Sequence, residues 1–169
     1  MKNSLPALLL LGSCLAGQAA ETTPDIAKKI VPPTTDWKAT IAALAPAAPR
    51  AKPKAPRKIL VCSLATGYCH GVIPHVKEVM NTLAATGAFE VTHSDDIEMF
   101  TPEKLRQFDA VVLNNTCTKR PARNWFVDVL AGNKDLTPEQ REKRAAELEQ
   151  SLIDFVAGGR GLVAVHGAI

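Results

Sequence analysis

The sequence has no glycine motif of the kind that cradles a nucleotide. Its first long apolar run is followed by Ala65-Thr-Gly-Tyr-Cys-His-Gly71, and its last is preceded by Gly158-Gly159-Arg-Gly161. Neither stretch has the G-x-G-x-x-G spacing that a dinucleotide-binding turn requires. We therefore expect no NAD, ATP or flavin site. Internal repeats are absent too, so 169 residues leave room for one domain of ordinary size plus a tail.

The net charge is also small, and aromatic side chains are few. Twenty Lys and Arg stand against 17 Asp and Glu, a net charge of +3, and aromatic residues make up 5% of the chain. The basic excess lies within one Pro/Ala-rich segment, at Arg50, Lys52, Lys54, Arg57 and Lys58. The remainder is close to neutral, so no nucleic-acid partner is expected.

No apolar run near the N-terminus is long enough to span a bilayer, which takes about 20 residues. The run Leu5–Leu11 follows Lys2 and precedes small residues, a pattern typical of an export signal over residues 1–20. Two cleavage sites remain open: an ordinary one near Ala20, and a lipoprotein one before Cys14, because Leu11-Gly-Ser-Cys14 resembles a lipobox. We expect an exported protein, periplasmic or secreted, whose one route to a membrane is a lipid anchor at Cys14.

Removal of the signal leaves an odd number of cysteines, which does not indicate a disulfide framework. Cys62 lies in an apolar run and is interpreted as a small core residue. Cys69 and Cys117 follow predicted strands, and the sequence leaves open whether they lie close enough to pair.

Residues 21–56 form a linker rich in Pro, Ala and Lys. A disordered tether is the favoured interpretation. The alternative is a short helix from Asp36 to Leu44, with Asp36 as N-cap and with Trp37 and Ile41 buried against the domain.

From Arg57 onward, strand and helix patterns alternate. Arg57 to Leu64 is a nearly continuous apolar run, typical of a strand buried on both faces. The later elements are a helix from Pro74 to Gly87, a strand over 89–93, a short helix from Thr101, a strand over 109–114, a helical turn at 125–130, a helix over 137–157 and a strand after 158. This order predicts a doubly wound α/β domain with a parallel sheet over 57–169.

The long helix carries the clearest local signals. Thr137-Pro-Glu-Gln140 is a capping box, because Gln140 is placed to reach back to the Thr137 backbone. One apolar stripe is expected to face the sheet: Ala145, Leu148, Leu152, Phe155 and Val156.

The closing stretch, Gly161–Ile169, puts His166 before a glycine where a buried strand ends. In open α/β sheets ligands bind at the carboxyl ends of the strands. Such a strand-to-turn unit normally leads into a helix that covers the sheet, yet three residues follow His166. We therefore expect a sheet truncated after its fourth strand, in either a truncated gene product or a fragment of a longer chain.

Three stretches together resemble the trehalose-utilisation (ThuA-like) domain: Lys58–His70, Asp109–Thr116 and Gly159–Ala168. That family belongs to the class I glutamine amidotransferase-like superfamily. The resemblance implies a flavodoxin-like sheet and a link with carbohydrate metabolism. It covers about residues 57–169, the N-terminal part of the family domain.

The resemblance also argues against one activity. The superfamily carries its nucleophile in a Cys-x-Gly turn, and alignment of that turn puts Val165 at the cysteine position and Gly167 at the glycine. A valine cannot act as a nucleophile, so glutamine amidotransferase activity is not expected. His166 remains as the polar group of the turn.

Polar side chains are expected where the predicted strands end. His166 and His70 are the candidate catalytic residues, since histidine titrates near neutral pH. The alternative is structural: a backbone-bonded His166 and a solvent-exposed His70. The candidate substrate-binding residues are Tyr68, Asn114, Asn115, Thr116 and Gly167. The asparagines equally suit Asx-type turns, which use the same side-chain amides.

No metal site is expected. His70 and His75 are five apart across a loop-to-helix junction without a close carboxylate, and His93 with Asp95 belongs to another strand end. The basic residues of the loop after the third strand are interpreted as a solvated surface: Lys119, Arg120 and Arg123.

Two functions remain open. The first is an exported enzyme that acts on a sugar or sugar derivative, with histidines moving protons. The second is a non-catalytic carbohydrate-binding or interaction module, which Val165 at the turn favours. The sequence leaves the oligomeric state open.

Overall fold

The computed structural model describes residues 30–51, 53–119, 121 and 123–168. The export signal and its candidate anchor Cys14, with the basic residues Lys52 and Arg120, lie outside the described residues. The elements, in chain order, are α2 (Thr35–Leu44), β1 (Arg57–Cys62), α3 (Ile73–Ala84), β2 (Phe89–His93), η1 (Ile97–Phe100), α4 (Pro102–Leu105), β3 (Ala110–Asn114), α5 (Trp125–Leu130), α6 (Pro138–Ala157) and β4 (Gly161–Val165).

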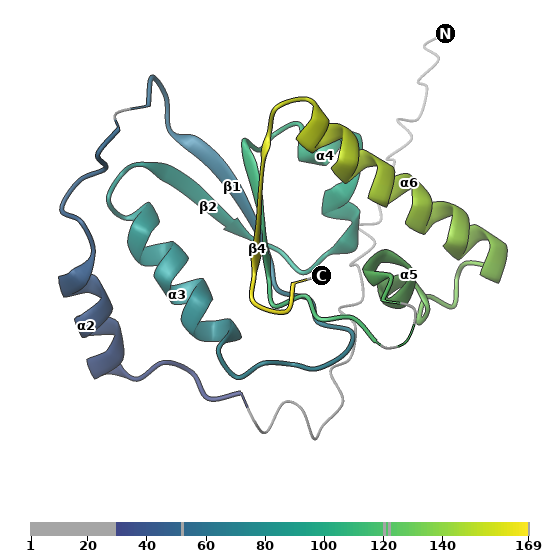
Figure 1. Ribbon diagram of the computed structural model, residues 1–169, viewed down its shortest axis with the longest axis horizontal. Helices are drawn as coiled ribbons and strands as arrows, with labels where there is room; N and C mark the ends of the chain where they lie inside the picture. Colours follow the sequence, from purple (N-terminus) through teal and green to yellow (C-terminus); the bar gives the residue numbers. More distant parts are fainter. Residues whose placement is uncertain (1–29, 52, 120, 122, 169) are drawn as a thin grey trace, which may run out of the picture.

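The four strands form one parallel sheet in the order β2-β1-β3-β4. The chain starts in the middle, crosses to one edge through α3, and returns to build the other edge through α6 (Figure 1). Helices lie on both sides of the sheet: α2 and α3 on one, α5 and α6 on the other (Figure 1). This α/β arrangement is flavodoxin-like and confirms the fold class expected from the alternating pattern.

The main hydrophobic core lies between the sheet and α4, α5 and α6. Leu60 of β1 is paired with Val111 of β3, and Cys62 with Leu113, so these four side chains share one face. Phe100 contacts the rings of Trp125 and Phe126, with centroids 5.1 and 5.5 Å apart. Val61 and Val112 alternate onto the opposite face, toward α3, and are also buried. Burial on both faces explains the continuous apolar runs of β1 and β3.

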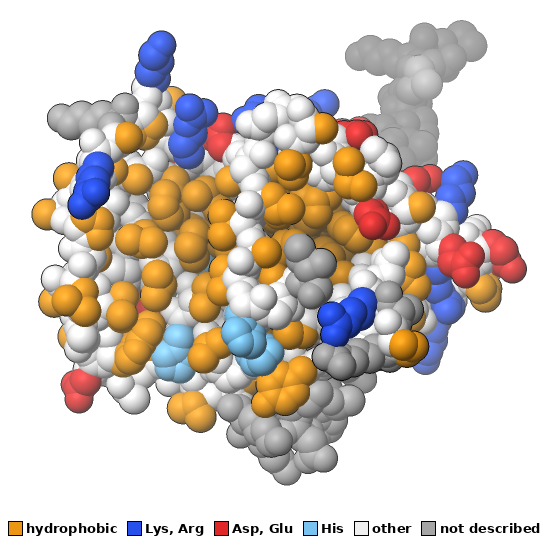
Figure 2. All heavy atoms as spheres, viewed as in Figure 1, with side chains coloured by type: hydrophobic (Ala, Val, Ile, Leu, Met, Phe, Trp, Pro, Cys, Tyr) orange, Lys and Arg blue, Asp and Glu red, His pale blue; other side chains and the backbone are white. Residues whose placement is uncertain are grey.

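At the outer edge β4 is much more exposed than its neighbours. Leu162 is 38% and Val163 is 50% exposed, whereas their partners Val111 and Val112 in β3 are buried. Figure 2 shows hydrophobic side chains on both sides of this strand. The described residues therefore bury most of β3 and the second half of β1, and they leave β4 an exposed edge strand.

Helix α6 begins as its sequence predicts. The Thr137 side chain accepts a hydrogen bond from the Gln140 backbone at 3.3 Å, and Gln140 Oε1 accepts one from the Thr137 backbone at 2.8 Å. Ala145, Leu148 and Phe155 are buried as expected, but Val156 is 39% exposed. Val156 follows Phe155 directly and therefore points about 100° away around the helix. Its assignment to the buried stripe was wrong.

The linker contains the alternative helix rather than a disordered tether over 35–44. Thr34, and not Asp36, caps it, by accepting a hydrogen bond from the Trp37 backbone at 3.2 Å. The Trp37 ring meets His75 of α3 edge-on, with centroids 4.8 Å apart, and Lys38 pairs with Glu78 at 3.3 Å. No residue of α2 is fully buried, so the expected burial of Trp37 and Ile41 was wrong.

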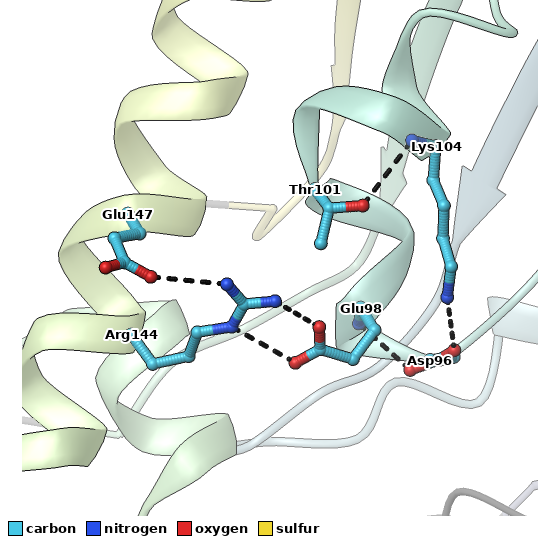
Figure 3. Close-up of polar contacts among 6 residues, drawn as sticks. All are labelled: Asp96, Glu98, Thr101, Lys104, Arg144 and Glu147. Carbon is cyan, nitrogen blue, oxygen red and sulfur yellow. Dashed lines mark hydrogen bonds and ion pairs between the residues drawn. The ribbon is translucent and has the colours of Figure 1, made fainter.

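A network of charged side chains joins α6 to the segment before β3 (Figure 3). Arg144 of α6 binds the carboxylate of Glu98 and, at 3.2 Å, that of Glu147. Lys104 binds Asp96 at 3.4 Å. Partly exposed ion pairs contribute little stability singly, and this network chiefly fixes how η1 and α4 sit against α6.

Asp109 connects three strands at the amino edge of the sheet. Its carboxylate accepts hydrogen bonds from the Lys58 backbone at 2.9 Å, from Arg57 at 3.1 Å and from Arg160 at 2.7 Å. Its backbone carbonyl accepts a bond from Gly161 at 2.9 Å. These contacts, the Lys58 backbone bond first, hold the pKa of Asp109 below its ordinary value. The start of β3 is thus tied to the starts of β1 and β4.

We expect Asp109→Asn to destabilise the fold near neutral pH and progressively less in acid. Because its pKa is lowered in the folded state, ionised Asp109 stabilises the fold above its unfolded pKa, and this stabilisation is lost as the pH falls through the lower folded pKa. Urea unfolding of both proteins between about pH 2.5 and 7 measures the effect. Asp135→Asn, on an exposed loop, is the control. A constant stability difference across this range would contradict the assignment.

Candidate functional site

The candidate site lies where the carboxyl ends of β1, β3 and β4 meet. Because the strands are parallel, three segments that are distant in the sequence meet at one edge: the loop 63–72 after β1, the loop 115–124 after β3, and the turn 166–168 after β4. This edge, which we call the rim, is the usual ligand position of an open α/β sheet.

The loops after β1 and β3 are bound to each other through one backbone carbonyl. The carbonyl oxygen of Cys117 accepts hydrogen bonds from the backbone N–H groups of Thr66 at 2.9 Å and Gly67 at 2.8 Å. Asp128 of α5 adds a second connection, because its carboxylate accepts bonds from the Thr66 hydroxyl at 3.1 Å and the Lys119 backbone at 2.8 Å. The two loops therefore form one backbone unit.

Gly67 lets the loops approach this closely. A Cβ atom at Gly67 would lie 2.3 Å from the backbone oxygen of Thr118, well inside van der Waals contact. The indole N–H of Trp125 further supports the β1 loop by donating to the carbonyl of Leu64 at 2.8 Å. The β1 loop thus reaches the rim with a fixed course.

His166 follows β4 directly and has an unusual backbone. Its φ of 56° lies in the left-handed region, which non-glycine residues rarely adopt. Such strained residues are common at functional sites, and a sharp strained turn after a strand is the geometry that exposes an elbow residue. Alignment with the superfamily placed Val165 at the elbow, whereas the strained backbone belongs to the next residue. His166 is exposed and therefore occupies the elbow position in this structure.

His70, on the β1 loop, meets His166 across the rim. The two ring centroids are 4.4 Å apart at an interplanar angle of 78°. The Tyr68 ring meets His70 on its other side, with centroids 4.6 Å apart, and Tyr68 is 63% exposed. Two of the residues predicted to be catalytic and one predicted to bind substrate are thus brought together at the surface.

The imidazole of His70 is biased toward its neutral form. Partial desolvation lowers its pKa below the ordinary value of 6.5, and repulsion from His166 lowers it further. Near neutral pH His70 therefore offers a ring nitrogen that can accept a proton, as a general base must.

Gly167 leaves space for two side chains beside the turn. A Cβ atom there would lie 2.5 Å from the Sγ atom of Cys117 and 3.6 Å from Nε2 of His70. The thiol and the imidazole thus approach the same point above Gly167. The sequence predicts a substrate contact for Gly167 but does not place Cys117 at the turn. That contact depends on the spacing between neighbouring strands, which no local motif encodes.

Asn114, Asn115 and Thr116 are fully buried beneath the rim. The Asn114 amide donates to Ser63 Oγ at 2.9 Å and to the Ile73 carbonyl at 3.2 Å, and the Asn115 amide donates to Asn114 Oδ1 at 2.8 Å. In the structure these side chains hold the β3 end against the start of α3. Direct contact with a ligand stays a prediction for all three.

Thr116 joins the same buried layer to the elbow. Its hydroxyl donates to the Ala168 carbonyl at 2.6 Å, and the Asn115 backbone donates to the Val165 carbonyl at 3.2 Å. The polar run at the end of β3 therefore fixes the turn that carries His166.

The other two histidines lie outside the rim. His75 packs against Trp37, and the His93 ring shares a hydrogen bond with Asn81 Oδ1 at 2.8 Å. Within the described part of the chain, no three His, Cys, Asp or Glu side chains are arranged to hold a metal ion. Two shallow surface hollows of about 660 and 630 Å³ also lie away from the rim, one beside α6 and the other at the amino edge of the sheet.

The parallel sheet, its strand order and the polar rim define a flavodoxin-like α/β domain with a candidate ligand site at the carboxyl edge. A family model described as trehalose utilisation (ThuA) matches residues 58–169, and the chain belongs to that family. Comparison with curated proteins finds no match, and comparison with solved structures finds none either. No helix among the described residues is both long and apolar enough to cross a membrane.

We expect Gly67→Ala to destabilise the domain by about 1–3 kcal/mol, because the added methyl group would overlap the backbone of Thr118. The free energy of unfolding in urea measures this loss. Gly132→Ala is the matched control, since a Cβ at Gly132 meets nothing within 4 Å. Equal effects of the two substitutions would contradict the close approach of the loops.

We expect His166→Ala to raise the pKa of His70 toward its ordinary value, because the substitution removes the neighbouring positive charge that opposes protonation of His70. Titration of the histidine ring protons by NMR measures both values. The signal of His93 serves as the internal control and should titrate unchanged. An unaltered His70 titration would show that the rings do not interact in solution.

Proposed function

We propose that the rim of this ThuA-family domain binds a sugar or sugar derivative, and that His70 and His166 move protons at its hydroxyl groups. Family membership indicates a role in the utilisation of trehalose or a related sugar. The observation that carries the proposal is the pairing of half-buried His70 with exposed His166, with ring centroids 4.4 Å apart, at the carboxyl edge of the sheet.

The chemistry of the three rings at the rim suits a carbohydrate. Tyr68 presents a ring that can cover the apolar face of a sugar, together with a hydroxyl group that can hydrogen-bond to it. The neutral imidazole of His70 accepts a proton from a hydroxyl or carbon acid, and His166 at the strained elbow supplies or receives the second proton. Hydrolysis, elimination or isomerisation of the sugar would each use such a pair.

Glutamine amidotransfer is not part of this proposal. Alignment with the superfamily puts Val165 at the position of its cysteine, and neither Val165 nor the strained residue His166 that follows it is a thiol. The proposal includes export of the protein to the periplasm or to the outside of the cell, with or without a lipid at Cys14.

A non-catalytic sugar-binding module is the second candidate. It is favoured by the sparse surroundings of the histidines: among the described residues, neither ring makes a hydrogen bond to another side chain. General bases are usually oriented by such a partner. The exposed Tyr68 would serve binding in either case.

We expect titration with trehalose, glucose and glucose derivatives to shift the ring-proton NMR signals of His70 and His166. The signals of His75 and His93, which lie elsewhere, should stay in place. Tyr68→Ala should weaken the binding constant roughly five- to tenfold, by loss of ring contact. Ile153→Ala, which removes an exposed apolar side chain of α6 outside the rim, is the control. Shifts confined to His75 or His93, or none at millimolar sugar, would contradict the proposed site.

The same samples separate the two candidate functions. If the protein is an enzyme, a bound sugar is converted over time, and His166→Ala stops the conversion while leaving the binding constant within about twofold. If the sugar binds without conversion, the non-catalytic module is correct. Unchanged turnover in folded His166→Ala would remove His166 from the mechanism.

A further inference from the structure

Two half-buried thiols lie in the two loops that meet at the rim. Cys69 stands between Tyr68 and His70 on the β1 loop, and Cys117 follows β3; both are free in the structure. Neither thiol takes part in the proposed proton transfer. Their side chains come from loops that already share the backbone hydrogen bonds of Cys117.

The neighbours of Cys69 on both sides along the chain lie close to Cys117. Its Sγ lies 2.5 Å from the position of a Cβ on Gly167, and His70, the neighbour of Cys69, reaches the same point to within 3.6 Å. Gly67, two residues before Cys69, bonds to the Cys117 carbonyl at 2.8 Å. A disulfide needs Cα atoms about 4.4–6.8 Å apart, and contacts on both sides of Cys69 bring its loop close to Cys117.

The electrostatics of the two thiols agree with their proximity. Desolvation raises the pKa of both, and the negative charge of Cys117 raises that of Cys69 further. A reactive nucleophile needs the opposite, a stabilised thiolate. Because desolvation is the largest influence on both thiols and disfavours their thiolates, the surroundings favour a lasting disulfide over a strongly oxidising one.

The third described cysteine does not compete. Cys62 is fully buried in β1, and burial raises its pKa to about 12. It remains protonated and out of reach of a dissolved disulfide.

We propose that Cys69 and Cys117 form a disulfide that fastens the β1 loop to the β3 loop at the rim. With oxidised glutathione as oxidant, one thiolate attacks a glutathione sulfur, forms a mixed disulfide and releases one glutathione. The second protein thiolate then attacks the protein sulfur of the mixed disulfide and releases the other glutathione. Two protein thiols are oxidised, one glutathione disulfide is reduced to two thiols, and the two protons pass to the departing glutathione sulfurs. The bond would hold His70 opposite His166 whether or not sugar is the ligand.

The test is peptide mapping of the full chain after equilibration with oxidised glutathione and quenching of free thiols with iodoacetamide. Trypsin leaves Cys62 and Cys69 on one peptide, because the nearest basic residues are Lys58 and Lys77, so chymotryptic cleavage after Tyr68 is needed to separate them. We expect the Cys69 peptide linked to the Cys117 peptide, Cys62 alkylated after denaturation, and an intact mass about 2 Da lower.

Single substitutions decide whether the bond is specific. Cys69→Ser and Cys117→Ser should each abolish the mass decrease of about 2 Da, which reports the two hydrogen atoms lost when one disulfide forms. Alkylation of both Cys69 and Cys117 in the oxidised wild type would overturn the proposal. So would linkage of either residue to Cys62 or Cys14.

Thermal unfolding distinguishes a native bond from a forced one. Oxidation should raise Tm by about 5 °C or more in the wild type, since the crosslink closes a loop between residues 69 and 117. The Cys69→Ser protein should show no such rise. A wild-type Tm that stays level or falls on oxidation would mean that the bond distorts the rim, and would overturn the proposal.

Discussion

The rim depends on one backbone carbonyl. Cys117 accepts hydrogen bonds from two successive N–H groups of the β1 loop, at 2.9 and 2.8 Å. The loops can come so close because residue 67 is a glycine and has no side chain. This contact places His70 beside the turn after β4. The layer below, formed by Asn114, Asn115 and Thr116, fixes that turn from the other side. The histidine pair is thus a product of backbone packing more than of attraction between the rings.

The fold was predictable because its signals are local or compositional. Buried parallel strands read as continuous apolar runs, and the capping box of α6 specifies its first turn by two hydrogen bonds within four residues. The errors arose where a shift of one or two residues along the chain decides which side chain is in place. Thr34 caps α2 because its hydroxyl reaches the Trp37 backbone, and Asp36 lies inside the first turn, where a negative charge is also favourable.

The position of the candidate site was predictable, but which of its polar side chains are buried was not. That strand ends carry ligand-binding groups follows from the parallel topology, and it brought His70 and His166 into view. Whether the side chain of a polar residue at a strand end faces solvent or the protein interior depends on neighbours from other strands. Asn114 turned inward because Ser63 and the Ile73 carbonyl offer it partners. The left-handed backbone of His166 likewise has no signature in its own residue type.

The exposed position of β4 has a consequence for its backbone. Gly161 donates to Asp109 and Val165 accepts from Asn115, so the odd-numbered residues of the strand direct their polar groups toward β3. In a parallel pair the intervening residues then direct theirs away from the sheet. The amides of Leu162 and Ala164 should therefore exchange with solvent deuterium far faster than those of Val163 and Val165. Solvent protection in β4 therefore alternates residue by residue.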